Sequence, residues 1–213
     1  MKKTCTYTTT NSYSTMNMCT DKTKNVWLVF HGIGYLSEFF IKYFRDLNPE
    51  ENYIICLQAP SKYYKDTKTY DQVGACWLTR ENTDIDIENV LNYVDAVVNQ
   101  ELRMNASQQL IVLGYSQGVS IASRWVGRRQ RVCNKLILVS GGIPTEFVSE
   151  NFDHCKGLKV IHTVGACDPL FSKAEVKNQE DYIFSLFGDR LTICNHDKGH
   201  KIDKILFSKY LAI

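Results

Sequence analysis

A serine between two glycines carries the clearest chemical signal in this chain, as the Gly-x-Ser-x-Gly pattern of residues 114–118 with Ser116 at its centre. The apolar residues 110–113 precede the pattern, and a helix-compatible stretch, residues 119–126, follows it. A strand, a sharp turn and a helix are the context of a nucleophile elbow, which raises a serine hydroxyl above the sheet. A Cβ atom at either glycine would crowd the strand or the helix. The pattern therefore predicts that Ser116 is a nucleophile.

A serine hydroxyl needs a base to take its proton, and the base is usually a histidine oriented by a carboxylate. Asp168 follows the predicted strand at residues 158–164, and His200 follows the predicted strand at residues 191–194. This is the order nucleophile, acid, histidine, with all three groups at carboxyl ends of strands, where open α/β sheets bind ligands. The spacing predicts a triad of Ser116, Asp168 and His200.

Other residues compete for two of these roles. For the acid, Glu146 and Asp153 follow the predicted strand at residues 136–139, but Asp168 stands in the better context. An Asp-Pro pair such as Asp168-Pro169 also commonly just starts a turn. For the base, the alternatives to His200 are His154, His162 and His196.

His196 and His200 are four residues apart, which is also a spacing of metal ligands. A metalloprotease helix of the H-E-x-x-H type needs a glutamate where Asp197 stands, and Gly199 disfavours a helix. We therefore expect no metal and no cofactor.

Two backbone N–H groups are predicted to stabilise the negative charge that develops on the substrate oxygen. One belongs to Gln117, the residue after the nucleophile, and the other to Ile33, in the His-Gly loop that follows the predicted strand at residues 26–30. Each such donor contributes about 3–4 kcal/mol to transition-state stabilisation. His31 is expected to anchor this loop rather than to act as a second base.

Strand-like apolar runs alternate with stretches of helical spacing along the 213 residues. The predicted strands cover residues 26–30, 53–57, 110–113, 136–139, 158–162 and 191–194. The predicted helices cover residues 37–47, 84–104, 173–187 and 201–211. This alternation predicts one doubly wound α/β domain over residues 1–213, with a mostly parallel sheet, helices on both faces and no large lid. Residues 1–24 are expected to add an edge strand or hairpin, or to be poorly ordered.

Composition excludes several classes of function. The 25 basic and 23 acidic residues nearly balance, so we expect no binding to nucleic acid. The arginines at positions 124, 128, 129 and 131 are expected to form a solvated helix end. No apolar run is long enough to span a membrane, and no signal peptide is evident, so we expect a cytoplasmic protein without stable membrane insertion. The eight cysteines are expected to be free thiols, mostly buried.

The chain resembles the phospholipase/carboxylesterase family of α/β-hydrolases, which includes the acyl-protein thioesterases. The matching residues are 30–32, 113–118, 165–170 and 199–200, and the resemblance runs from about residue 26 to the end of the chain. It implies the minimal α/β-hydrolase fold and a substrate site that includes Trp77, Gly32 and Tyr115. Residues 61–83 depart from the family's usual acyl-channel loop, so the substrate does not transfer.

The expected function is hydrolysis of small or single-chain acyl esters through an acyl-serine intermediate. A thioesterase or lysophospholipase using the same triad is the alternative within hydrolases. A non-catalytic binding module on a hydrolase scaffold is the alternative from another class. The expected partner is a small acyl ester. A homodimer is an open alternative, because minimal hydrolases often expose apolar surface.

Overall fold

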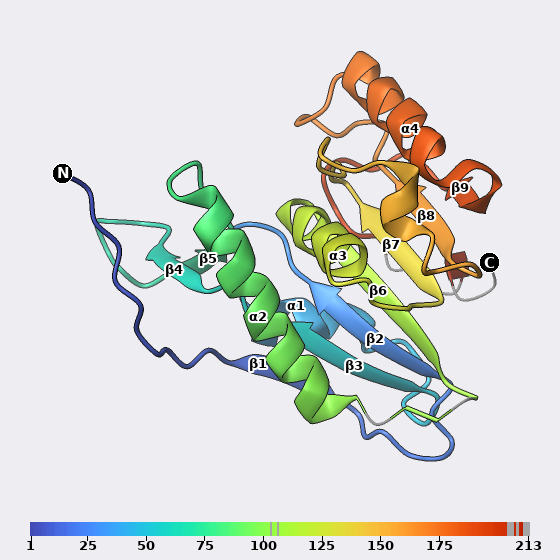
Figure 1. Cartoon of the computed structure of the whole chain (residues 1–213), viewed down its shortest axis with the longest axis horizontal. Helices are drawn as coiled ribbons and strands as arrows, with labels where there is room; N and C mark the ends of the chain where they lie inside the picture. The colour runs from blue at the N-terminus through green and yellow to red at the C-terminus, as the bar shows by residue number, and fades with distance from the viewer. Residues whose placement is uncertain (103, 106, 204–206, 208, 211–213) are drawn as a thin grey trace.

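A seven-stranded sheet forms the centre of the computed structural model, which describes residues 1–102, 104–105, 107–203, 207 and 209–210 (Figure 1). The strands lie side by side in the order β1 (Tyr13–Met16), β3 (Asn52–Leu57), β2 (Asn25–Phe30), β6 (Gln109–Tyr115), β7 (Lys135–Val139), β8 (Lys159–Thr163) and β9 (Leu191–Ile193). All neighbours pair in parallel except β1, which runs antiparallel to β3 at the edge. The predicted mostly parallel sheet is confirmed.

Side chains alternate between the two faces of the sheet, and both faces are covered. One face carries Leu28 and Val112 and packs against helices α2 (Thr83–Glu101), α3 (Gln117–Arg128) and α4 (Lys173–Phe187). The other carries Trp27 and Ile111 and packs against α1 (Ser37–Phe40), the following 3-10 turn η1 (Ile41–Phe44), Phe207 and Tyr210. In Figure 1, α2 and α3 cross one face while α1 lies behind the sheet. Burial on both faces explains the continuous apolar strand sequences.

The helix predicted over residues 37–47 differs from the observed structure. It is one short α-helical turn, α1, that tightens into η1, and its first residue, Ser37, makes no side-chain cap. Three residues per turn in the 3-10 geometry place Ile41 and Phe44 on the same side, and both are buried against the sheet. The helix predicted over residues 173–187 is confirmed as α4, which Ser172 and Glu175 cap reciprocally. The helix predicted over residues 201–211 falls largely outside the described residues.

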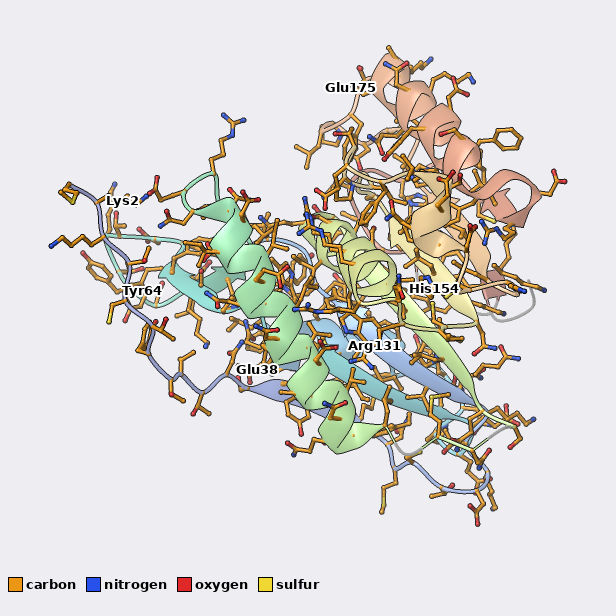
Figure 2. All side chains as sticks on the ribbon, viewed as in Figure 1. Lys2, Glu38, Tyr64, Arg131, His154 and Glu175 are labelled. Carbon is orange, nitrogen blue, oxygen red and sulfur yellow. The ribbon has the colours of Figure 1, made fainter. Side chains whose placement is uncertain are left out.

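Two irregular stretches contain short strands. The edge strand expected near the amino terminus forms at β1, and residues 1–12 carry no helix or strand. Residues 59–83 contain a hairpin of β4 (Ser61–Tyr64) and β5 (Val73–Cys76), which is separate from the main sheet. The exposed Tyr64 of this hairpin and Lys2 lie at the same end of the molecule (Figure 2), and Lys2 pairs with Glu81. The hairpin ends at Cys76, and the next residue, Trp77, is buried in the core.

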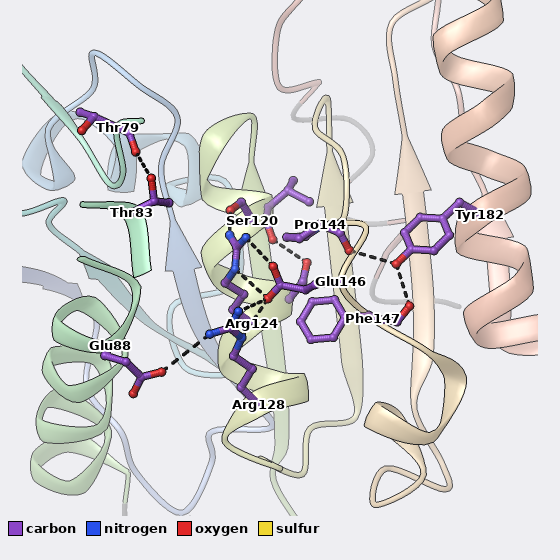
Figure 3. Close-up of polar contacts among 12 residues, drawn as sticks. Thr79, Thr83, Glu88, Ser120, Arg124, Arg128, Pro144, Glu146, Phe147 and Tyr182 are labelled. Carbon is purple, nitrogen blue, oxygen red and sulfur yellow. Dashed lines mark hydrogen bonds and ion pairs between the residues drawn. The ribbon is translucent and has the colours of Figure 1, made fainter. Parts of the chain in front are cut away.

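The sequence predicted a solvated helix end for the arginines at the end of α3. In the structure these arginines form ion pairs. Arg124 and Arg128 both bind Glu146, and Arg128 also approaches Glu88 (Figure 3). Arg131 binds Asp95 on α2 and lies close to His154, whose Nε2 is 3.3 Å from the Arg131 carbonyl oxygen (Figure 2). The acidic partners come from distant segments, so the arginines join α3 to α2 and to the loop after β7.

All eight cysteines are free thiols, as predicted. Five are buried, in line with the expectation that most would be, and Cys167 is exposed on the loop after β8. Within the described residues, no helix combines the length and the apolar character needed to cross a membrane.

Candidate active site

Ser116 occupies the sharp turn between the end of β6 and the start of α3. Its backbone angles are φ 53° and ψ −120°, a region that costs a non-glycine residue conformational energy. The strain is maintained by the surroundings, because the Ser116 N–H donates to the Val139 carbonyl at 2.8 Å and its carbonyl accepts from Val119 N–H at 3.0 Å. The turn thus holds the Ser116 side chain at the carboxyl ends of the parallel strands.

The glycines on either side of Ser116 allow backbones to approach closely. A Cβ atom on Gly118 would lie 2.2 Å from the Phe30 carbonyl oxygen, and one on Gly114 would lie 2.5 Å from Val119 Cα. Both clashes would be with backbone atoms, so the rotation of a side chain could not remove them. Glycine at these two positions is therefore a steric requirement of the elbow.

A chain of hydrogen bonds connects Ser116 with His200 and Asp168. Ser116 Oγ lies 3.0 Å from His200 Nε2, and His200 Nδ1 lies 2.7 Å from Asp168 Oδ2. The Asp168 side chain is almost completely buried, and its second oxygen accepts the Leu170 N–H at 2.9 Å. An ionised carboxylate against Nδ1 favours the tautomer that leaves Nε2 free to accept the serine proton.

Contacts between two loops bring the acid and the histidine together. The loop after β8 meets the loop after β9 in a bridge between Gly165 and His196. Ala166 N–H donates to the His196 carbonyl at 2.7 Å, and Cys167 N–H donates to the Lys198 carbonyl at 3.3 Å. These backbone bonds lie directly before Asp168 and His200 in the chain, so they set the relative position of the two side chains.

The alternative acids and bases lie elsewhere. Glu146 is bound by Arg124 and Arg128, and His154 lies against the Arg131 carbonyl. His162 is buried within β8, where loss of solvent lowers its pKa to about 4. His196 Nδ1 accepts the Lys198 N–H at 3.2 Å within the turn before His200. Over the described part of the chain, no three metal-binding side chains lie close enough together to hold a metal ion.

The loop after β2 lies directly against the elbow. A Cβ atom on Gly32 would lie 3.1 Å from Ser116 Cβ and 2.9 Å from Tyr115 Cδ1, so glycine permits this contact. Ile33 follows Gly32, and its side chain is 54% exposed. Gln117 is the first residue of α3, and N–H groups in the first turn of a helix have no helical acceptor. Both expected oxyanion donors therefore belong to backbone segments that border Ser116.

His31 anchors this loop from the core, as its sequence position suggested. Its Nδ1 donates to the Gly32 carbonyl at 2.8 Å, while its Nε2 accepts the Ala59 N–H at 3.1 Å. The ring is completely buried, which lowers its pKa to about 4 even though the bond to Gly32 acts in the opposite direction. The low pKa makes the ring a weak base, and both of its nitrogens are already hydrogen-bonded in the core, so His31 is unsuited to act as a second base.

Trp77 and Tyr115, which were expected to bind substrate, are buried behind the site. The Trp77 side chain is 0% exposed, and its indole N–H donates to the His31 carbonyl at 2.7 Å. The Tyr115 ring stacks on Phe40, and its hydroxyl donates to the His200 carbonyl at 3.0 Å. Both residues contact the loops that carry the site rather than solvent. The apolar run that surrounds Trp77 in the sequence was the available signal for this burial.

Comparison with known proteins shows the family of this chain. The model of the phospholipase/carboxylesterase family matches residues 11–211. The chain belongs to the phospholipase/carboxylesterase family. A search of curated proteins finds no match by sequence.

Solved structures show the same α/β-hydrolase fold at low sequence identity. Acyl-protein thioesterase 2 of Zea mays is 14% identical with a TM-score of 0.71, and the match covers 94% of this chain and 96% of that one. A phospholipase/carboxylesterase of Dyadobacter fermentans is 18% identical with a TM-score of 0.65, covering 97% and 99%. The Bacillus cereus carboxylesterase is 15% identical with a TM-score of 0.63, covering 94% of each chain. This family member therefore has the minimal α/β-hydrolase fold.

Apolar side chains border the site of this phospholipase/carboxylesterase family member. Besides Ile33, Leu170 is 62% exposed on the loop that carries Asp168, and the Phe171 ring centroid lies 6.1 Å from that of His200. Two surface hollows of about 560 and 490 Å³ lie elsewhere, at residues 18–24 and 49–51 beside the amino ends of β2 and β3. Their lining holds mixed charges and none of the triad residues.

Proposed function

We propose that this protein is a serine carboxylic-ester hydrolase that forms an acyl-serine intermediate. The observation that carries the proposal is the hydrogen-bonded chain from Ser116 through His200 to Asp168. Two further features support the same assignment. The backbone is strained at Ser116, and the buried His31 anchors the loop beside it. A non-catalytic binding module has no need of a strained serine within reach of a histidine that is held by a buried carboxylate.

In the proposed reaction each site residue has a defined role. His200 Nε2 takes the Ser116 proton as Oγ attacks the carbonyl carbon, and Asp168 stabilises the imidazolium that forms. The N–H groups of Ile33 and Gln117 bind the oxyanion. His200 then gives the proton to the leaving alcohol or thiol. Water repeats the cycle to release the acid and regenerate Ser116.

Small or single-chain acyl esters are the proposed substrates. Ile33 and Leu170 offer exposed apolar contacts to an acyl chain beside the serine. The longest connection in the described part of the chain, residues 58–82, holds only the short β4–β5 hairpin, so no large lid lies among these residues. Acyl thioesters and lysophospholipids can be hydrolysed by the same triad chemistry, so they are the second class of candidate substrates.

A fluorophosphonate probe tests the proposed nucleophile. We expect covalent labelling of the folded protein at Ser116, located by peptide mass spectrometry, and loss of labelling in Ser116→Ala. Ser123→Ala is the matched control, since Ser123 lies on the same helix and its hydroxyl donates only to the Val119 carbonyl. An unlabelled Ser116 in the folded wild-type protein would refute the hydrolase assignment.

Substrate preference is tested by turnover of p-nitrophenyl acetate, p-nitrophenyl octanoate and a palmitoyl thioester at equal concentrations. We expect the two esters to give the higher kcat/KM. A strong preference for the palmitoyl thioester would contradict the small-acyl assignment and favour the thioesterase alternative.

A further inference from the structure

The side chain of Gln117 makes two hydrogen bonds that join the elbow to the end of the β4–β5 hairpin. Its Oε1 accepts the Trp77 N–H at 2.8 Å, and its Nε2 donates to the Leu78 carbonyl at 2.7 Å. Both ends of the side-chain amide are therefore held by the backbone of residues 77–78. Gln117 is the first residue of α3, so these bonds restrain the start of the helix. They therefore also restrain the backbone N–H of Gln117, which lies beside Ser116.

The same segment holds the loop of the other donor. Trp77 Nε1 donates to the His31 carbonyl at 2.7 Å, and the Gly34 N–H donates to the Ala75 carbonyl at 2.8 Å. These bonds lie before and after Ile33 in the chain. Residues 75–78 thus contact both sides of the predicted oxyanion site through buried or partly buried hydrogen bonds.

The bond from His31 Nδ1 to the Gly32 carbonyl sets the direction of the Ile33 N–H. That carbonyl and the Ile33 N–H belong to one peptide unit, in which the two groups point in opposite directions. Holding the carbonyl at the His31 ring therefore turns the N–H away from that ring. The indole of Trp77 packs against the same ring, with centroids 5.1 Å apart.

We propose that Gln117 and Trp77 are positioning residues that fix the separation of the two oxyanion donors, Ile33 N–H and Gln117 N–H. Gln117 acts through its side chain, independently of its backbone N–H. Neither side chain needs to touch the substrate. This inference rests on the proposed hydrolase function, because it concerns the donors of that same site.

Gln117→Met tests the proposal, because methionine has a similar length and no charge and lacks both hydrogen bonds. Misplacing a catalytic group by about 1 Å costs about 10²-fold in rate, and losing one donor costs about 10²–10³-fold. We expect kcat for p-nitrophenyl acetate to fall about 10- to 100-fold, with KM changing less than about 3-fold. Affinity for a boronic acid transition-state analogue should fall by a similar factor, while affinity for acetate and the pH profile stay unchanged.

Trp77→Phe is the second variant, since it removes the indole N–H and keeps an aromatic ring. It should show the same separation of kcat from KM with a smaller loss. Thr83→Val is the matched control, because it removes a 2.7 Å bond to the Thr79 carbonyl in the adjoining loop without touching the site (Figure 3). Circular dichroism and thermal unfolding establish that each variant is folded.

Two outcomes would separate the inference from the function on which it rests. If wild type is labelled and active, but folded Gln117→Met and Trp77→Phe keep kcat and analogue affinity within about 2-fold, the positioning role is wrong and the hydrolase function stands. If wild type is neither labelled nor active, the function itself is wrong.

Discussion

Helix α3 begins at the proposed nucleophile and ends in a cluster of arginines, and its two ends are held in different ways. The first end has short bonds among backbone groups and buried side chains, with glycines at the points of closest approach. The last end has long charged side chains that reach partly exposed carboxylates on α2 and on the loop after β7.

The contacts at the first end position side chains relative to one another, whereas those at the last end attach neighbouring segments to the helix. At the end that begins at Ser116, small displacements change the distances between the groups that are proposed to react. At the arginine end, Arg124 and Arg128 adjust to reach Glu146, so the contacts attach segments without setting a reaction geometry. We therefore expect changes at the first end to alter rate more than stability, and changes at the last end to do the reverse.

The largest effect is expected for Ser116→Ala. Removing a serine nucleophile lowers kcat by at least about 10⁴-fold, and by about 10⁶-fold in the best-studied case. The free energy of unfolding should change by less than about 1 kcal/mol, because the backbone bonds that hold the turn remain. Ester turnover and urea unfolding measure the two quantities. An equally large loss of stability would break the comparison.

Asp168→Asn is expected to lower kcat by about 10⁴-fold, because an amide beside His200 Nδ1 favours the wrong tautomer. Turnover of p-nitrophenyl acetate measures the loss. Glu146→Gln is the matched carboxylate control, and it should keep kcat within about 2-fold. A larger loss in Glu146→Gln than in Asp168→Asn would assign the acid to the loop after β7.

Acid should destabilise the protein in two separate pH windows. His31 and His162 have pKa values lowered from 6.5 to about 4, because burial disfavours the charged rings. Between pH 6.5 and 4 the unfolded chain binds protons that the folded chain does not. Stability should therefore fall by about 1.4 kcal/mol per pH unit for each of these histidines. Urea unfolding between pH 7 and 4.5 measures this slope, and His162→Leu should halve it.

The arginine end should respond at lower pH. Partial burial raises the pKa of Glu146, but the hydrogen bonds from Arg124 and Arg128 lower it overall from 4.5. Stability from Glu146 is therefore present above pH 4.5 and is lost as the pH falls through its depressed pKa. A Glu146→Gln variant that changes the slope between pH 6.5 and 4.5 would contradict this assignment of windows.

Smaller effects are expected from neutralising the partners of the arginines. Glu146→Gln should lower the free energy of unfolding by about 1–2 kcal/mol, because Arg124 is largely buried and loses a charged acceptor. Glu88→Gln should cost at most about 1 kcal/mol, because Glu88 is half-exposed and its ion pairs are screened by solvent. Chemical denaturation of both variants measures which one loses more stability. A larger loss in Glu88→Gln would show that burial does not determine the size of the effect.

Much of the end that carries Ser116 could be predicted because its signals are local. The strand before Ser116 and the helix after it are neighbours in sequence, and the chain order of Asp168 and His200 follows from the topology of a parallel sheet. The supports of the site were not predictable in this way. Gln117 contacts Trp77 across 40 residues and Leu78 across 39, and Tyr115 contacts the His200 carbonyl across 85 residues.

The ion pairs of the arginine end show the same limit. Arginines at a helix end predict favourable charge, but their sequence does not say which carboxylates they reach. Glu146 attracted attention as a candidate acid because it follows a predicted strand. Only the path of the loop after β7 places it against Arg124 and Arg128.

By itself, the sequence determined the alternation of strand and helix, the turn at Ser116 and the order of the acid and histidine. These features depend on side-chain size and polarity over a few neighbouring residues. The tertiary structure alone decided that Trp77 is buried, that the Gln117 amide is bound by residues 77–78, and that Asp168 rather than Glu146 faces His200. Such contacts depend on distances between segments that are far apart in the chain, and those distances exist only after the sheet and its loops have packed.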